Sequence, residues 1–180
     1  MFAMSGATRE HNLITGNIAA SLHGQVKDRP CESYAADMRV LFIVSPTGLY
    51  TYPDVVVTCQ SPRFEDDVFD TLLNPQVIIE VLSDSTEKYD RTKKFEQYRQ
   101  IESLQDYVLI SHDRAHVDHF SRAAHGKWEL SDAAGLEAAL DLPTIQCQLK
   151  LSDIYAKVEL PPNSPEADRA AGLFRAGESP

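Results

Sequence analysis

The sequence predicts an α/β (α+β) fold in which helices flank a mixed β-sheet, and three observations support this prediction. Residues Val77 to Leu82 are mostly β-branched or aliphatic, which is typical of a strand buried on both faces. An apolar helical repeat precedes this run and a charged helical segment follows it. Residues 106–111, 115–122 and 127–130 then resemble three strands joined by tight turns, which predicts an antiparallel β-meander.

The composition indicates an ordinary globular protein with one domain, because 180 residues suffice for a substantial core. No apolar stretch approaches the roughly 20 residues that span a bilayer, and we recognise no signal peptide. The cysteines Cys31, Cys59 and Cys147 are odd in number, far apart and without metal-ligand spacing, so we expect reduced thiols in a cytoplasmic protein. The formal net charge of -10 disfavours loose, sequence-independent DNA binding, although bound metal can offset the carboxylates of a nuclease.

The first predicted helix begins after Ser5 or Thr8 and ends near Lys27. Its buried stripe repeats every four residues, at Ile14, Ile18 and Leu22. His11 falls on the same stripe and should therefore point inward. Two interpretations stay open for His11: a core histidine that is hydrogen-bonded to backbone, or a residue beside a metal site.

Strands are predicted over residues 38–44 and 50–59, with a turn at 45–48 between them. Pro53 indicates an edge position or a bend near the start of the second strand. Residues 61–71 form an acidic loop, which we interpret as a solvated surface rather than a second metal site.

Two acidic residues lie in apolar runs. Asp54 begins the run of valines after Pro53, and Glu80 interrupts the run from Val77 to Leu82. A buried carboxylate must be paired, protonated or metal-bound, because an isolated buried charge is very costly. If the two strands are neighbours, both carboxylates can meet at one strand end and bind Mg²⁺ or Mn²⁺, with the Val81 carbonyl as a third ligand.

A second helix is predicted from about Thr86 to Gln100. Its inner face carries Phe95, Tyr98 and Ile101. Asp90, Lys94 and Tyr98 lie together at the edge of that face, whereas Lys93 points away. Lys94 is therefore predicted to reach the sheet, and the alternative is a surface lysine that pairs with Asp90.

These residues suit phosphoester hydrolysis. A metal at Asp54 and Glu80 would acidify water and neutralise phosphate charge, while Lys94, held by Asp90 and Tyr98, would orient or help deprotonate the water. A Gly-rich phosphate loop and a Gly-x-Ser-x-Gly motif are absent from the sequence. A transition-metal site is also compatible with four histidines of the meander, although surface hairpin histidines are commoner: His112, His116, His119 and His125.

An ordered set of motifs resembles the Uma2 family (DUF820), which belongs to the restriction-endonuclease-like PD-(D/E)XK superfamily. The motifs are Tyr52-Pro-Asp-Val-Val-Val, Asn74-Pro-x-x-x-Ile-Glu-Val-Leu-Ser-x-Ser-Thr86, Tyr89-Asp-Arg-x-x-Lys-x-x-x-Tyr98 and Asp106-Tyr-Val-Leu-Ile. The resemblance implies four mixed core strands flanked by helices, with Asp54 and Glu80 as metal ligands. It also implies that Lys94 replaces the lysine that usually lies two residues after the second acid, where this chain has Leu82.

The resemblance suggests a domain at residues 1–158. Residues 159–180 are rich in proline and small residues that have little to bury, so we expect a flexible tail there. Family members usually carry a further helix and strand before the Met1-Phe-Ala-Met-Ser-Gly segment, so we expect an N-terminally shortened domain. Glu10 is the one nearby acid available to replace an upstream acid of the site.

The first functional hypothesis is a Mg²⁺- or Mn²⁺-dependent endonuclease that cuts DNA, with a homodimer expected by analogy with related nucleases. The alternative is a catalytically inactive domain of the same fold that binds nucleic acid or protein.

Overall fold

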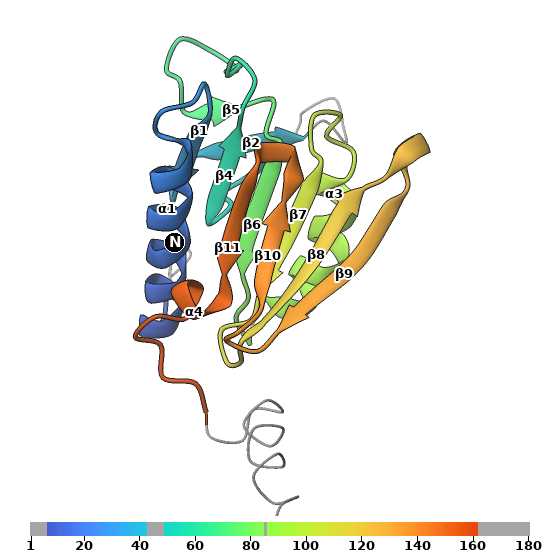
Figure 1. The fold of residues 1–180 in the computed structure, drawn as a ribbon. Coiled ribbons are helices and arrows are strands. Elements are labelled where there is room, and N and C mark those ends of the chain that lie inside the picture. The colour runs from blue at the N-terminus through green and yellow to red at the C-terminus, as the bar shows by residue number, and fades with distance from the viewer. Residues whose placement is uncertain (1–6, 43–48, 85, 162–180) are drawn as a thin grey trace, which may run out of the picture.

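The computed structural model describes residues 7–42, 49–84 and 86–161. Its centre is a six-stranded sheet with the order β1-β4-β6-β7-β8-β9 (Figure 1). Strands β6 and β7 are parallel and the other neighbouring pairs are antiparallel, which confirms the predicted mixed sheet and meander. The strands are β1 (Glu32–Ala35), β4 (Val55–Thr58), β6 (Val77–Val81), β7 (Asp106–Ile110), β8 (His116–Arg122) and β9 (Trp128–Ala134).

Strand β6 is buried along its whole length because both faces of the sheet are covered. Val77, Ile79 and Val81 pack into one apolar cluster, and Ile78 and Leu82 pack into the other. This double burial is the physical reason for the continuous apolar run in the sequence.

Helix α1 (Arg9–Val26) covers one face together with the hairpin of β10 (Ala139–Leu142) and β11 (Cys147–Lys150) and the short helix α4 (Leu151–Ile154) (Figure 1). The predicted stripe of Ile14, Ile18 and Leu22 is fully buried against this layer. The side chain of Thr8 caps α1 by accepting a hydrogen bond from the His11 amide at 3.2 Å. Within the part of the chain that the structure describes, no helix combines the length and apolar content needed to cross a membrane.

A helical segment covers the other face in three consecutive parts: α2 (Glu87–Tyr89), the π-turn η1 (Asp90–Lys94) and α3 (Phe95–Tyr98). It links the parallel strands β6 and β7, as a crossover helix does. The predicted inner face is confirmed, because Phe95, Tyr98 and Ile101 pack into the second apolar cluster. The π-turn was not predicted, and such turns often occur at functional sites. The described residues also include two short 3₁₀ turns, η2 (Ala124–Gly126) and η3 (Pro143–Ile145).

The prediction of one strand over residues 50–59 is wrong. The chain forms β3 (Leu49–Thr51) and β4 in different sheets, and β3 pairs with β2 (Arg39–Phe42), which also pairs with β5 (Thr71–Leu72). Pro53 explains the break, because it has no amide hydrogen for a ladder and a restricted φ. The predicted turn at 45–48 and most of the predicted tail, residues 162–180, lie outside the described residues.

The acidic loop was predicted to be a solvated surface. Glu65, Asp66 and Asp67 are exposed, in agreement with that interpretation. Asp70, at the end of the loop, pairs with Arg39 of β2.

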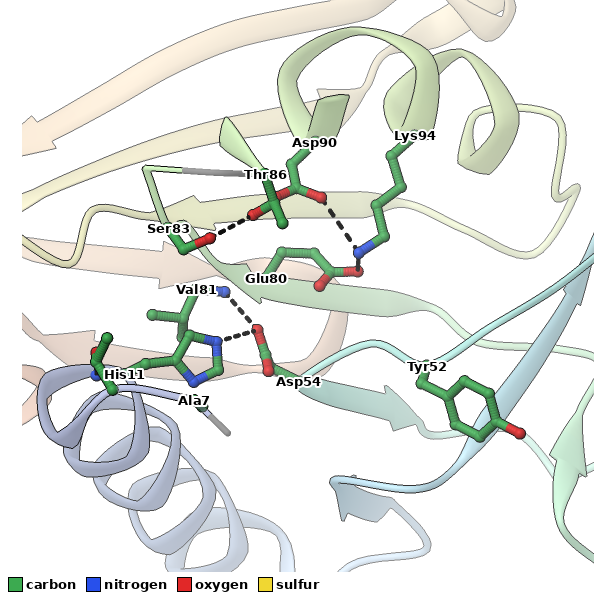
Figure 2. Close-up of a pocket in the computed structure, with 11 residues that line it drawn as sticks. Ala7, His11, Tyr52, Asp54, Glu80, Val81, Ser83, Thr86, Asp90 and Lys94 are labelled. Atoms are coloured by element: carbon green, nitrogen blue, oxygen red, sulfur yellow. Dashed lines mark hydrogen bonds and ion pairs between the residues drawn. The ribbon is translucent and has the colours of Figure 1, made fainter. Parts of the chain in front are cut away.

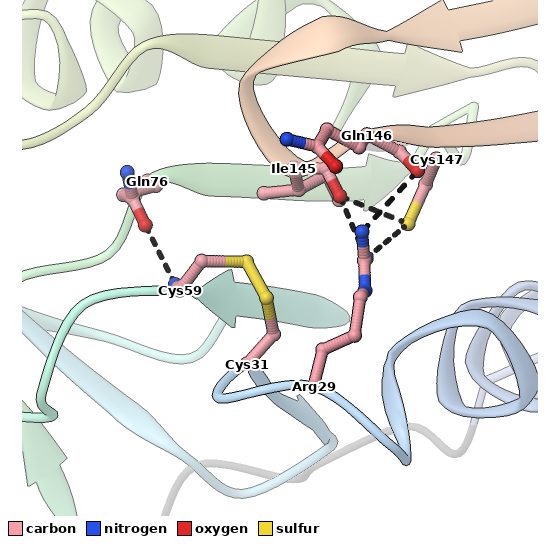
Figure 3. The surroundings of a disulfide bond; sticks show 7 residues. All are labelled: Arg29, Cys31, Cys59, Gln76, Ile145, Gln146 and Cys147. Carbon is pink, nitrogen blue, oxygen red and sulfur yellow. Dashed lines mark hydrogen bonds between the residues drawn. A yellow bond between two sulfur atoms is a disulfide. The ribbon is translucent and has the colours of Figure 1, made fainter.

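The prediction of three reduced cysteines is also wrong. Cys31 and Cys59 form a disulfide, and Cys147 is a buried free thiol (Figure 3). The last register pair of β1 and β4 is Glu32 with Thr58, so the next step along the ladder brings the two cysteines opposite each other. Beside them, Arg29 donates hydrogen bonds to the Ile145 carbonyl oxygen at 2.7 Å and to the Cys147 sulfur at 3.2 Å.

Reduction of this disulfide should lower the free energy of unfolding by about 3 kcal/mol, because the bond closes a loop between residues 28 positions apart. Urea unfolding with and without dithiothreitol measures the change. Cys31→Ser should have the lower stability at the outset and no response to the reductant. Cys147→Ser is the matched control and should respond as the wild type does. A wild-type protein that is equally stable under both conditions would contradict the prediction.

Candidate active site

A pocket of about 370 Å³ opens where the end of β6, the bend before β4 and the start of α1 meet the α2–η1 segment (Figure 2). It contains every residue predicted for the site except Tyr98, which lies behind Glu80. The lining residues are Ala7, Thr8, His11, Tyr52, Asp54, Glu80, Val81, Ser83, Thr86, Asp90 and Lys94.

Strand register brings Asp54 and Glu80 together. The last register pair of β4 and β6 at this end is Val55 with Ile79, so Asp54 and Glu80 are opposite each other one step further on. Asp54 Oδ2 accepts a hydrogen bond from the Val81 amide at 2.7 Å, which fixes the carboxylate at the end of β6. The predicted meeting of the two acids at one strand end therefore agrees with the geometry.

Glu80 lies on the same face of its strand as Ile78 and Leu82 and therefore faces the helical segment rather than α1. Its Oε1 atom lies 2.8 Å from Lys94 Nζ and accepts a hydrogen bond from the Tyr98 hydroxyl at 2.9 Å. Burial raises the pKa of Glu80 to about 7, although the Lys94 ammonium lowers it. Glu80 therefore changes protonation near neutral pH when no metal is bound.

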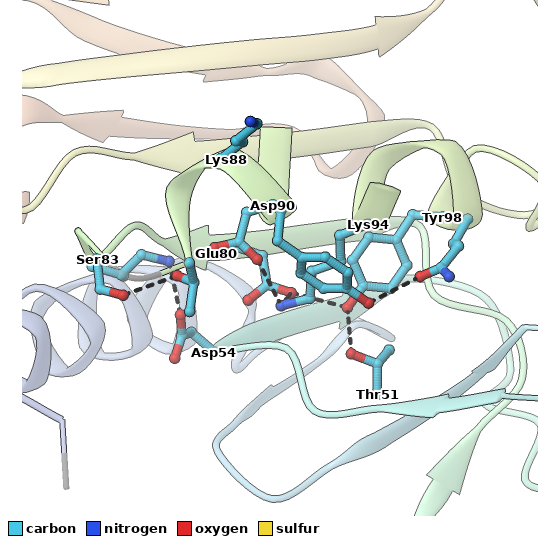
Figure 4. A network of polar contacts seen from close by, with 12 residues as sticks. Thr51, Asp54, Glu80, Ser83, Lys88, Asp90, Lys94 and Tyr98 are labelled. Atoms are coloured by element: carbon cyan, nitrogen blue, oxygen red, sulfur yellow. Dashed lines mark hydrogen bonds and ion pairs between the residues drawn. The ribbon is translucent and has the colours of Figure 1, made fainter. Parts of the chain in front are cut away.

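Lys94 reaches the sheet, as the helical spacing predicts, and its side chain is 14% exposed. Its ammonium contacts Glu80 and also Asp90 Oδ1, at 3.3 Å (Figure 4). Burial lowers the pKa of Lys94, but the charges of Glu80 and Asp90 outweigh burial and raise it overall. Lys94 therefore stays protonated at neutral pH.

Tyr98 differs in detail from the prediction that it holds Lys94. Its hydroxyl hydrogen-bonds Glu80 and, at 3.0 Å, the hydroxyl of Thr51 on β3. The ring lies 6.0 Å from Lys94 Nζ, so it contacts the lysine only through its face. Tyr98 thus positions Glu80, and Asp90 positions Lys94.

His11 lies in the pocket rather than among the apolar residues of α1. Its Nε2 atom is 3.3 Å from Asp54 Oδ2. The hydrogen bond to Asp54 raises the pKa of His11, although burial opposes this. Of the two interpretations that the sequence left open, the position beside the paired carboxylates agrees with this geometry.

The donor set is compatible with a hard divalent cation. One oxygen of each carboxylate is held by a hydrogen bond, Asp54 Oδ2 by the Val81 amide and Glu80 Oε1 by the Tyr98 hydroxyl. Among the described residues, no group of three or more His, Cys, Asp or Glu side chains could hold an ion. An ion at Asp54 and Glu80 would take its other ligands from main chain, water or substrate, as Mg²⁺ commonly does.

Two hydroxyls of the pocket were not predicted as site residues. Ser83 Oγ and Thr86 Oγ1 lie 2.9 Å apart in the turn between β6 and α2. The sequence carries a signal for them, because Ser83 and Thr86 are residue types that cap helices and they follow a buried apolar strand. Glu10, the proposed substitute acid, pairs with Arg9 at 3.5 Å and does not line the pocket.

Three of the four histidines of the meander pair with a nearby acid instead of forming a cluster. His119 lies 2.7 Å from buried Asp106, His116 lies 3.1 Å from Asp118, and His112 lies 3.4 Å from Asp84. The fourth, His125, lies in an exposed turn. Over the described ranges these side chains form no group suited to a metal, so the transition-metal alternative receives no support.

The ionisation of Glu80 predicts a pH effect on stability. The folded protein should hold the Glu80 proton up to about pH 7, whereas the unfolded chain loses it near the ordinary pKa of 4.5. The stabilisation due to Glu80 is therefore fully present below pH 4.5 and lost as the pH rises through 7.

In the absence of metal, we expect the free energy of unfolding of the wild type to decrease relative to that of Glu80→Gln as the pH rises from 4.5 through 7. Urea unfolding at pH 4.5, 6 and 7.5 measures the difference. Glu129→Gln changes an exposed residue of β9 and should stay parallel to the wild type. If the free energy of unfolding of Glu80→Gln also changes with pH in parallel with that of the wild type, Glu80 ionises with its ordinary pKa.

Comparisons with known proteins agree with this fold. Residues 1–153 match the model of the Uma2 family, which is described as "Putative restriction endonuclease". Two uncharacterized proteins of Synechocystis sp. (strain PCC 6803) are similar to the chain. Protein sll1609 is 35% identical over 77% of this chain and 77% of its own length, and slr1290 is 30% identical over 86% of this chain and 79% of its own length.

A crystal structure of a "putative nuclease belonging to DUF820" from Anabaena variabilis matches with a TM-score of 0.68. The match has 18% identity and covers 86% of this chain and 85% of that one, so the two chains share a fold. Together with the match of the family model over most of the chain, these findings show that the chain belongs to the Uma2 family.

Proposed function

We propose that this protein is a divalent-metal-dependent endonuclease that hydrolyses DNA phosphodiester bonds. The observation that carries the proposal is the meeting of Asp54, Glu80 and Lys94 in one pocket. The description of the Uma2 family as restriction endonucleases and that of the Anabaena protein as a nuclease support the same reaction class.

Asp54 and Glu80 would hold Mg²⁺ or Mn²⁺ through their carboxylate oxygens, with the Val81 carbonyl as a further ligand. The chemistry that such an ion supplies is positive charge beside the phosphate and a more acidic attacking water. Val81 contributes in a second way, because its amide fixes the Asp54 carboxylate at 2.7 Å.

Lys94 would offset the negative charge that develops on the phosphate. Because its pKa is raised, its ammonium donates hydrogen bonds at neutral pH and is poorly suited to accept a proton from water. Asp90 would keep Lys94 in the pocket when Glu80 turns to a metal, since the lysine contacts both carboxylates. This favours charge stabilisation and water orientation as its role over that of a general base.

His11 and Tyr98 would serve as positioning residues. His11 pairs with Asp54 from the α1 side, and Tyr98 donates a hydrogen bond to Glu80 from the helical segment. Each metal-binding carboxylate thus has a neighbour that fixes one of its oxygens, an arrangement that tunes metal sites generally.

The wild type should nick supercoiled plasmid in Mg²⁺ or Mn²⁺. Asp54→Asn and Lys94→Ala should each reduce the nicking rate at least 100-fold, because Asp54 holds the metal and Lys94 carries the ammonium that offset the charge of the reacting phosphate. Agarose electrophoresis follows the nicked and linear products. Lys93→Ala is the matched control, since Lys93 is exposed on the same turn. A linear product formed directly from the supercoiled form would favour the expected homodimer, because two sites can cut both strands.

If the folded wild type nicks no plasmid, the endonuclease hypothesis is wrong. If such a protein still shifts DNA in a gel, the alternative of a catalytically inactive binding domain takes its place. If Lys93→Ala loses as much activity as Lys94→Ala, the role proposed for Lys94 is wrong.

Mn²⁺ should raise the melting temperature of the wild type, because a ligand of the folded state at 100 times its Kd stabilises it by about 2.7 kcal/mol. Differential scanning fluorimetry measures the shift. Asp54→Asn should lose it, whereas Asp66→Asn, which alters an exposed carboxylate of the acidic loop, should retain it. The metal site is rejected if the wild type shows no shift or if Asp54→Asn retains the full shift.

A further inference from the structure

Tyr52 holds an unusual place at the rim of the pocket. It lies two residues before Asp54, in the bend between β3 and β4, and it is the one tyrosine or phenylalanine among the described residues that line the pocket. Figure 2 shows its side chain extending away from Asp54, toward the outside of the pocket.

Tyr52 is mostly open to water. The residue is 58% exposed, and no ring contact, hydrogen bond or ion pair joins it to another described residue. An aromatic face left open to water is a ready surface for stacking. The start of the bend is fixed nearby by the hydrogen bond between Thr51 and Tyr98.

A second aromatic residue lies close by in the chain. Tyr50 on β3 is 42% exposed, and the Arg39 guanidinium lies 5.3 Å from the centre of its ring. The segment that leads into the pocket thus presents two exposed tyrosines, one of them beside an arginine.

The charge of the pocket favours stacking over phosphate contacts as the source of affinity. Lys94 is the one lysine or arginine among the described lining residues, and the whole chain carries a formal net charge of -10. Duplex binding depends mainly on several cationic contacts to phosphates, whereas stacking of a base on an aromatic ring needs none.

The position of Tyr52 at the pocket also favours stacking on an unpaired base. A side chain beside the scissile phosphate meets the face of a base only when that nucleotide is unstacked, because duplex bases cover each other's faces. We infer that the substrate carries an unpaired nucleotide next to the scissile bond and that Tyr52 stacks on its base. This inference rests on the proposed nuclease function and adds the class of substrate: single-stranded DNA, or a duplex with an unpaired segment.

Fluorescence anisotropy with three labelled probes tests the inference in Ca²⁺, which like Mg²⁺ takes oxygen ligands. The probes are a 12-nucleotide single strand, its duplex, and the same strand with abasic sites in place of the bases. The wild type should bind the single strand about tenfold more tightly than either other probe, because stacking of one base on an aromatic ring increases the affinity by roughly a factor of ten.

Tyr52→Ala should bind the single strand about tenfold more weakly and lose the preference over the abasic strand. Tyr52→Phe should keep the preference, since it retains the ring without the hydroxyl. Tyr89→Ala is the matched control, because Tyr89 is 45% exposed and does not line the pocket.

Equal binding of the base-containing and abasic strands, or of single strand and duplex, by the wild type overturns the stacking inference. So does a Tyr52→Ala variant that behaves as the wild type. Either result leaves the endonuclease standing if the plasmid is still nicked. A wild type that neither binds any probe nor nicks plasmid removes the proposed function, and the inference with it.

Discussion

The hydrogen bond from the Val81 amide to Asp54 Oδ2 is the contact on which the arrangement of the site depends. The ladder between β4 and β6 ends at the pair of Val55 and Ile79, so the Val81 amide lies beyond the last backbone pair. The Asp54 side chain takes the place of a backbone acceptor and continues the pairing for one more step. Asp54 is thereby held opposite Glu80, and the chain turns out of the sheet toward Tyr52 and β3.

Charge balance is the second constraint. The carboxyl groups of Asp54, Glu80 and Asp90 meet the Lys94 ammonium and the His11 imidazole in one pocket. Burial of a carboxylate is costly unless it is paired, and Glu80 is paired with Lys94 at 2.8 Å. The proposed metal and Lys94 would therefore compete for the same carboxylate, and Asp90 is placed to hold the lysine when Glu80 is taken. Structural ion pairs also perturb pKa values, but a shifted pKa within a pocket is typical of functional sites.

Local periodicity made much of this molecule predictable. The four-residue repeat of α1, the apolar run of β6 and the helical position of Lys94 relative to Lys93 each follow from side-chain direction within a single element. The unpredicted features depend on contacts between elements. The pairing of Cys31 with Cys59 requires the register of β1 and β4, and β1 itself is short and only partly buried. The side-chain partner of His11 likewise requires the position of α1 against the bend at Asp54.

The acidity of the chain connects metal binding with substrate binding in the proposed function. A phosphate that enters the pocket meets the carboxylates of Asp54, Glu80 and Asp90, and Lys94 is the one lysine or arginine among the described lining residues. Because like charges repel strongly where water is partly excluded, a phosphodiester should bind poorly until a cation neutralises these carboxylates. Substrate and cation should then each increase the affinity of the pocket for the other, since coupling between two ligands is reciprocal. In such a site the carboxylates not only hold the metal but also exclude substrate in its absence.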